Sequence, residues 1–262
     1  MSFVNDKDER DYAELLRALR RVDAWLARMD PDARGLQPQP KSPLHGDDDR
    51  TRPYQVSHAA WNSLTHAVDH LHCLRSVLQD ARLIHMFAPF SLVRPALENA
   101  SAGVWILKPQ RRCERITRRL RLAADDIRKG EEARRLTGST GPRSQEERLG
   151  DIRDIAKQVG VEPAVALGRV GYGEIIAAVS SPASPAADVN ILCWRLCSGV
   201  AHGDFWTTIN ATDRIELPPI SPDVGAFKIT AHMGLLGYVT RIAVEMTALG
   251  WRLYDQRCSP PY

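Results

Sequence analysis

Several signatures of nucleotide and ester chemistry are missing from this sequence. It has no GxxxxGK[ST] phosphate loop, no GxGxxG turn following a strand and no nucleophile elbow of the GxSxG type. The sequence therefore argues against nucleoside triphosphate hydrolysis, dinucleotide-dependent redox chemistry and α/β-hydrolase chemistry.

The sequence also lacks an uninterrupted apolar run of about 20 residues, the length that a membrane-spanning helix needs. The apolar stretch 86–107 contains Arg94 and Glu98, and the stretch 229–254 contains Arg241 and Glu245. The first ten residues are polar and charged, so no secretory signal is expected. These features predict a soluble protein without a membrane partner.

The sequence has few cysteines and few lysines. The 5 cysteines are odd in number and form no CxxC motif, which fits a reducing cytoplasm better than a disulfide framework. Only 6 of the 35 basic residues are lysines, and the formal net charge is +3. A charge this small does not by itself indicate nucleic-acid binding, and a GC-rich genome explains an arginine bias as well as phosphate contacts do.

Apolar residues recur at helical spacing along most of the chain. This pattern predicts helices over 6–29, 55–86, 89–107 with a kink near Pro95, 109–136, 145–159, 173–179 and 223–254, and a further helix ending at His202-Gly203. Ser184 is its expected N-cap and Pro185 its first helical residue. Residues 30–53, which carry five prolines, and 137–144 are expected to be exposed loops, and 205–217 a short strand pair or a loop. The predicted fold is a single all-α domain, a bundle of five or more main helices.

The segment 194–203, WRLCSGVAHG, contains the best candidates for chemistry. Arg195 and His202 are seven residues apart, which places them on one helix face with Cα atoms about 10 Å apart. A guanidinium binds phosphate oxygens, and an imidazole can transfer protons near neutral pH. The alternative is structural: an arginine that bridges helices, and a histidine that complements the helix macrodipole near the C-terminus.

An arginine followed by a few residues and a histidine, late in a helix of an all-α bundle, resembles the HEPN superfamily. The resemblance covers the last third of the chain and implies that Arg195 and His202 cleave RNA without a metal or other cofactor, at a site formed where two protomers meet. It also implies a toxin or defence effector with RNA, an antitoxin or a regulatory protein as partners. The family often has a polar residue directly after the arginine, where this chain has Leu196. That difference favours the alternative function, a non-catalytic helical binding or assembly protein that keeps the fold.

Arg94 and Glu98 lie four residues apart in an otherwise apolar helix. Buried charges need partners, so the two are expected to be mostly buried and to pair with each other or to line a cleft. We predict that they lie near Arg195 or His202 and form, with Ser198, an auxiliary wall of the site. A purely structural ion pair between helices is the alternative.

Two further patterns are less specific. The predicted helix 109–136 carries Arg111, Arg115 and Arg118 on a basic face that could bind a nucleic-acid backbone, although a solvated face explains the pattern almost as well. His66 and His70 are at the i, i+4 spacing of metal ligands, but no HExxH surrounds them, so we expect packing histidines and no metal site. Because the proposed site supplies one arginine and one histidine, a homodimer is expected to complete it.

Overall fold

The computed structural model describes residues 6–30, 37–180 and 186–260. These residues are mainly helical, which confirms the predicted all-α architecture, and they separate into two compact units. The first unit comprises the described residues within 1–33, 65–100 and 180–248, and the second those within 34–64, 101–179 and 249–262. Three helices contribute residues to both units: α4 (Val56–Arg75), α5 (Ala88–Leu107) and α12 (Met233–Cys258).

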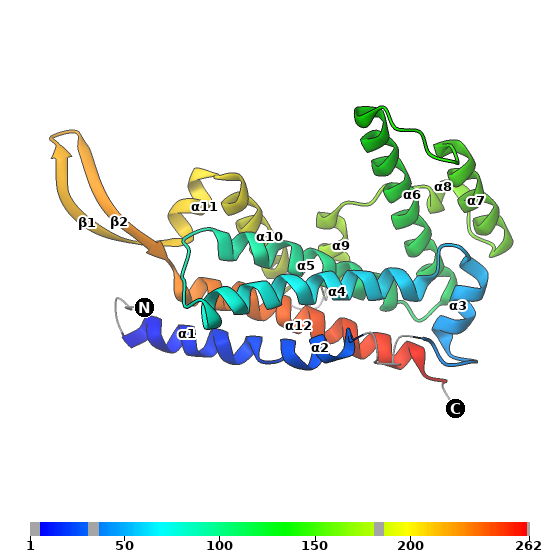
Figure 1. The fold of residues 1–262 in the computed structure, drawn as a ribbon, viewed down its shortest axis with the longest axis horizontal. Helices are drawn as coiled ribbons and strands as arrows, with labels where there is room; N and C mark the ends of the chain where they lie inside the picture. The colour runs from blue at the N-terminus through cyan, green and yellow to red at the C-terminus, as the bar shows by residue number, and fades with distance from the viewer. Residues whose placement is uncertain (1–5, 31–36, 181–185, 261–262) are drawn as a thin grey trace. The chain divides into compact units, whose positions relative to one another are not determined.

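The first unit contains α10 (Ala186–His202), which is followed by the short helix α11 in Figure 1. Its other elements are α1 (Asp6–Leu19), α2 (Val22–Arg28), the π-helical turn η2 (Ser76–Asp80), α11 (Phe205–Asn210), β1 (Thr212–Ser221) and β2 (Val224–Ala231). The core is aliphatic and includes Leu15, Leu19, Leu71, Leu74, Leu78, Phe90, Val93, Leu97, Leu236 and Val239. Polar contacts fix its edges: Tyr12 Oη donates to the carbonyl oxygen of Leu78 over 2.5 Å, and Arg75 pairs with Asp23.

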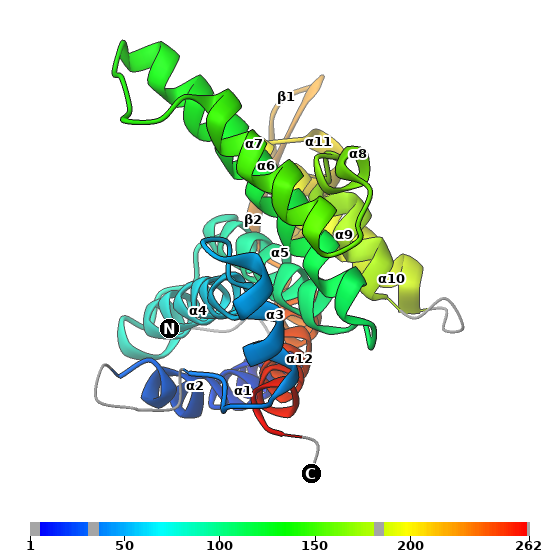
Figure 2. The same cartoon turned by 90° about the vertical axis from the view of Figure 1, so that its right-hand side faces the viewer.

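The second unit is organised around α6 (Arg112–Thr137), along which α7 (Gln145–Gln158) lies (Figure 2). It also contains α3 (Pro43–Thr51), α8 (Pro163–Ala166) and α9 (Tyr172–Val179). Ile116, Leu120 and Ile127 of α6 are buried at the helical spacing that the sequence shows. Trp61, Trp251 and Tyr254 pack edge to face, with ring centroids 5.1–6.0 Å apart.

Part of the predicted exposed loop 30–53 is the helix α3, so that prediction was wrong for 43–51. Ser42 caps the helix by accepting a hydrogen bond from the backbone N–H of His45, and Pro43 begins it. Asp47 is fully buried because Arg112 and Arg115 of α6 neutralise its carboxylate. The run Asp47-Asp48-Asp49 resembles a solvated loop in the sequence, because the arginines that neutralise Asp47 are 65 and 68 residues away. Residues 31–36 lie outside the described residues.

Other boundaries also differ from the sequence prediction. The helix predicted over 6–29 is divided at Arg20-Arg21 into α1 and α2, and the helix predicted to reach Met86 ends with η2 at Asp80. The expected strand pair is present, but it is the hairpin β1–β2 over 212–231, and 205–210 is the helix α11. The last helix therefore starts at Met233 and not near Asp223. The predicted N-cap Ser184 and the first-turn Pro185 lie outside the described residues.

Among the described residues, no helix combines the length and the apolar character that crossing a bilayer requires.

Candidate functional site

His202 is the last residue of α10 (Ala186–His202), and the chain ends this helix there for a clear local reason. Gly203 has a φ of 77°, the left-handed conformation that glycine adopts without strain. The N–H of Asp204 donates to the carbonyl of Gly199 over 2.9 Å, and the N–H of Gly203 donates to that of Val200 over 3.2 Å. This pair of bonds is a Schellman motif, and it fixes the backbone that carries His202. The predicted stop at Gly203 is confirmed.

Gly199 permits a close approach just before this cap. A Cβ placed at residue 199 would lie 2.4 Å from Cγ2 of Thr207 in α11 and 3.0 Å from Oδ2 of Asp204. Thr207 is fully buried, and its hydroxyl donates to the carbonyl of Asp204 over 2.7 Å. The last turn of α10 and the first turn of α11 are therefore packed directly against each other.

Two contacts within the first unit join α5 to α10. Arg94 Nη1 lies 3.0 Å from Nε2 of His202, and Trp194 Nε1 donates to Oε1 of Glu98 over 2.7 Å. Arg94 precedes Glu98 by one turn whereas Trp194 precedes His202 by two, so the two segments run antiparallel. The proximity of Arg94 to His202 is the one that the sequence predicts.

A single carboxylate oxygen, Oε1 of Glu98, links two of these side chains. Oε1 of Glu98 accepts from Arg94 Nε over 3.0 Å as well as from Trp194. The Glu98 side chain is only 12% exposed, whereas that of Arg94 is 26% exposed and His202 is exposed at the surface. Charge-assisted hydrogen bonds in such a half-buried setting orient the guanidinium strongly. Glu98 therefore holds Arg94 toward His202 and toward solvent.

The contact also specifies the histidine tautomer. A guanidinium has donors and no acceptor, so Nε2 of His202 must accept the hydrogen bond from Arg94. In this hydrogen bond, Nε2 is therefore the ring nitrogen without a proton. A ligand that binds Arg94 would release Nε2 to accept a proton.

Arg195 and Ser198 take different positions on α10. Arg195 is exposed, and within the described residues it has neither a hydrogen bond nor an ion pair. Ser198 is half-buried and lies one turn before His202, on the face that also carries Trp194. Sequence reasoning did not select Trp194 as a site residue, although its i, i+4, i+8 spacing with Ser198 and His202 is a usable signal.

The face of α10 opposite these residues belongs to the core. Cys193 and Cys197 are buried, and burial raises the pKa of their thiols to about 11 and about 12. Because the thiolate is the reactive form, burial lowers the nucleophilicity of both thiols.

The arginines of α6 serve the interior of the second unit more than its surface. Arg115 is 2% exposed, and its guanidinium donates to Asp47 and to the carbonyls of Pro109 and Gln110. Arg118 donates to the carbonyl of Trp105 and lies over its ring, and burial lowers its pKa. Of the three arginines predicted to bind nucleic acid, only Arg111 is exposed. The expectation of a continuous basic face fails at Arg115 because the buried Asp47 takes up its charge.

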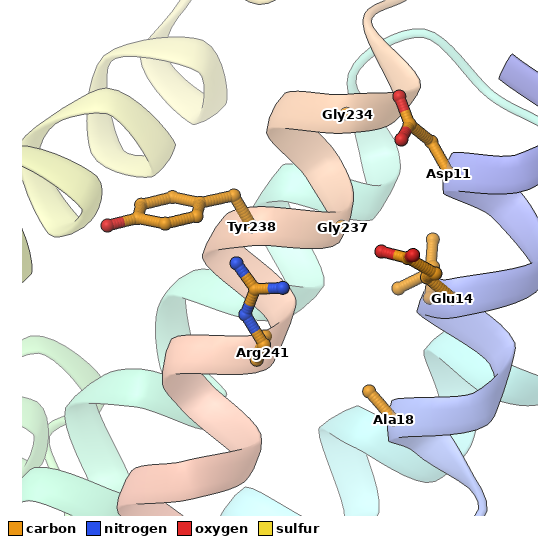
Figure 3. Close-up of a pocket in the computed structure, with 8 residues that line it drawn as sticks. Asp11, Glu14, Ala18, Gly234, Gly237, Tyr238 and Arg241 are labelled. Atoms are coloured by element: carbon orange, nitrogen blue, oxygen red, sulfur yellow. The ribbon is translucent and has the colours of Figure 1, made fainter. Parts of the chain in front are cut away.

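A small pocket of about 160 Å³ lies between α1 and α12 in the first unit (Figure 3). Asp11 and Glu14 project from α1, and Tyr238 and Arg241 from α12, where the guanidinium lies 5.4 Å from the tyrosine ring centroid. Gly234 leaves space for the Asp11 carboxylate, which is 2.8 Å from where a Cβ would be. The pocket is smaller than the range of about 300–1,000 Å³ typical of ligand sites. None of its lining residues belongs to the His202 group, which consists of Arg94, Glu98, Trp194 and His202.

A second pocket, of about 320 Å³, lies in the second unit and is basic. It is lined by Pro53, Tyr54, Arg134, Pro142, Arg143 and Arg148. Asp151 pairs with Arg143 through two hydrogen bonds of 2.8 and 2.9 Å, whereas Arg148 has no carboxylate partner among the described residues. Arg134 also pairs with a carboxylate, that of Glu131, at 3.5 Å.

The described residues contain no group of three or more histidine, cysteine, aspartate or glutamate side chains arranged to hold a metal ion. His66 is exposed and His70 is half-buried, and burial lowers the pKa of His70.

Comparison of the chain with protein-family models, with curated proteins and with solved structures gave no match.

Proposed function

We propose that this chain is a metal-independent endoribonuclease whose cleavage site is formed by His202, Arg94 and Arg195. The observation that carries the proposal is the 3.0 Å contact between Arg94 Nη1 and His202 Nε2 at an exposed helix end. A proton-transfer group and a permanent cation beside each other at the surface are the two components that phosphodiester cleavage by an adjacent hydroxyl requires.

In the proposed reaction, a phosphate of the RNA attracts Arg94 away from His202. The freed Nε2 then accepts the proton of the ribose 2′-hydroxyl, whose oxygen attacks the adjacent phosphorus as the bond to the 5′-oxygen breaks. The leaving 5′-oxygen takes its proton from water, the hydroxide left behind removes the proton from Nε2 of His202, and the products carry a 2′,3′-cyclic phosphate and a 5′-hydroxyl. Arg94 stabilises the charge that develops on the phosphate oxygens.

Glu98 and Trp194 would act as positioning residues for this chemistry. Glu98 contacts Arg94, and Trp194 contacts only Glu98 within the group. Arg195 lies about 10 Å along the helix from His202, because seven residues rise by 1.5 Å each. We therefore assign it a neighbouring phosphate, a contact that contributes to binding.

A second copy of the chain is part of the proposal, since a symmetric dimer would present two such groups to one RNA. The expected antitoxin or regulatory partner stays a prediction from the family resemblance.

The alternative function is that of a non-catalytic binding or assembly protein. The specific observation in its favour is the hairpin β1–β2, whose exposed apolar side chains are typical of an interaction surface. In that case the Arg94–His202 contact is a structural link between α5 and α10.

The test is RNA cleavage by the purified protein in the presence of EDTA. Wild type should cut RNA, and His202→Ala should lower the rate by about 100-fold or more, the usual effect of removing a general acid or base. The matched control is His66→Ala, which removes another exposed histidine from the first unit and should cut at the wild-type rate.

Arginine variants separate the two cationic roles. Arg94→Ala should lower the cleavage rate at saturating RNA, whereas Arg195→Ala should raise KM and reduce the salt dependence of binding by about one counterion. Arg20→Ala, at an exposed arginine of the first unit, is the control. Intact RNA after incubation with wild type, or equal rates for wild type and His202→Ala, would favour the binding protein instead.

A further inference from the structure

The hairpin β1–β2 exposes an unusual number of large apolar side chains. Figure 1 shows the two strands extending away from α10 and α11 within the first unit. Six apolar residues of the hairpin are between 37% and 78% exposed: Ile215, Leu217, Ile220, Val224, Phe227 and Ile229. A two-stranded hairpin is only marginally stable in water, and three or more strands with an apolar face are normally needed. The hairpin therefore has the composition of a sheet that is completed by another strand.

The edge of β1 is open, because the sheet of the described residues consists of β1 and β2 alone. Such an edge presents backbone donors and acceptors to any added strand. We propose that the occupant is β1 of a second copy of this chain, paired antiparallel about a two-fold axis at Ile215. The two hairpins then form one four-stranded sheet in the order β2, β1, β1, β2. This proposal does not depend on RNA cleavage.

The charges of β1 select both the partner and the register. A two-fold axis perpendicular to the sheet keeps each residue on its own face, so residue i can pair only with a residue of the same parity. With the axis at Ile215, Arg214 lies opposite Glu216 of the second copy, and this pair occurs twice. Axes at 213, 214 or 216 would instead place two identical charges opposite each other. This self-complementary pattern indicates a second copy of the chain.

The remaining sequence of the hairpin agrees with this register. Pro218 and Pro219 lack the N–H that a ladder needs, and with the axis at Ile215 they fall at the ends of the paired segment. β2 contains a single charged residue, Lys228, so pairing β2 with its own copy would produce no opposite charges. In the proposed sheet, Ile215 packs against its counterpart at the centre, and Leu217 lies on the same face opposite Asp213 of the second copy.

Charge exchange tests the register. Wild type should be a dimer by light scattering at micromolar concentration. Arg214→Glu places two glutamates opposite each other at two positions, so the dissociation constant should rise about tenfold or more. The double variant Arg214→Glu/Glu216→Arg exchanges the charges in both copies and should return the dissociation constant to within about threefold of wild type. Circular dichroism checks that each variant folds.

A cross-link tests the position of the axis. In a background with Cys73, Cys113 and Cys258 changed to serine, Ile215→Cys should form a covalent dimer on mild oxidation. Opposed Cα atoms in an antiparallel pair are about 4.5–5.5 Å apart, within the range for a disulfide. The control is Lys228→Cys, on the β2 residue that pairs with Ile215 within one hairpin. Its two copies would be three strand spacings, about 14 Å, apart and should not cross-link.

A monomeric wild type would overturn the proposal. So would a dimer that Arg214→Glu leaves unchanged, a double variant as weak as the single one, or equal cross-linking at residues 215 and 228.

Discussion

At the scale of single residues, buried carboxylates hold arginine side chains in place by accepting hydrogen bonds from their guanidinium groups. Glu98 holds Arg94 beside His202, and Asp47 holds Arg112 and Arg115 beside α3. The pairs differ in exposure: Asp47 is fully buried with its arginine partner Arg115, whereas Arg94 reaches the surface. The Glu98–Arg94 pair is therefore accessible to a ligand, whereas the Asp47–Arg115 pair stabilises the fold.

Removal of the Asp47 carboxylate should be strongly destabilising. Asp47→Ala leaves the Arg115 guanidinium buried without its counter-charge, which typically costs about 3–5 kcal/mol of unfolding free energy. The control Asp49→Ala removes an exposed carboxylate from the same helix and should cost no more than about 1 kcal/mol. Urea unfolding followed by circular dichroism measures both. An equal loss of unfolding free energy in Asp47→Ala and Asp49→Ala would mean that the Asp47 carboxylate is solvated.

Cysteine reactivity should follow burial. With thiol pKa values of about 11 and about 12 against an ordinary 9.0, the thiolate fractions of Cys193 and Cys197 near pH 8 fall by about 100-fold and about 1,000-fold. In native protein, an alkylating reagent should label the exposed Cys73 and Cys113 first, and Cys193 and Cys197 only after denaturation. Peptide mapping by mass spectrometry determines the order in which the cysteines are alkylated.

The same pKa values make stability depend on pH. Because folding raises the two pKa values, the folded state holds these protons more tightly than the unfolded state does. Their contribution to stability is complete below pH 9 and is lost as pH rises from 9 through about 11 to 12. Unfolding midpoints that rise across this range in the wild type, and not in a Cys193→Ala/Cys197→Ala variant, would contradict this account.

At the scale of elements, the junction of α10 and α11 positions His202. Gly199→Ala would force Cβ into Thr207 and should lower the free energy of unfolding by about 1–3 kcal/mol, as overpacking of a core does. Gly150→Ala is the matched control, since a Cβ at this helical glycine of α7 meets nothing within 4 Å. Its effect should be neutral or stabilising by up to about 1 kcal/mol. A tolerated Gly199→Ala would show that α11 moves freely.

The elements also show what the sequence could and could not predict. The long helices were predictable because their buried faces repeat at helical spacing, as Ile116, Leu120 and Ile127 do. α3 was missed although Ser42-Pro43 is the same helix-start signal as Ser184-Pro185. The burial of Asp47 was not predictable, because it depends on Arg115, 68 residues away. The extent of β1 and β2 was missed because the hairpin is mostly exposed and the alternation in each strand, as in Arg214-Ile215-Glu216-Leu217, covers only a few residues.

At the scale of the whole molecule, the described residues form two compact units, and the His202 group belongs entirely to the first. The sequence predicted that Arg94 lies near His202, because a charged pair inside an apolar helix needs polar surroundings. It could not predict that Glu98 also accepts a hydrogen bond from Trp194, or that Arg195 is exposed without a partner among the described residues. Those facts depend on how α5 and α10 run relative to each other.

The account is tested most directly with two versions of one RNA oligonucleotide that contains a single cleaved position. One version is all RNA, and the other has a single 2′-deoxynucleotide at that position. Because His202 is proposed to activate the 2′-hydroxyl, the first should be cut to a 2′,3′-cyclic phosphate and the second should stay intact at that position. Cleavage of both versions at the same position and rate would contradict the proposed role of His202.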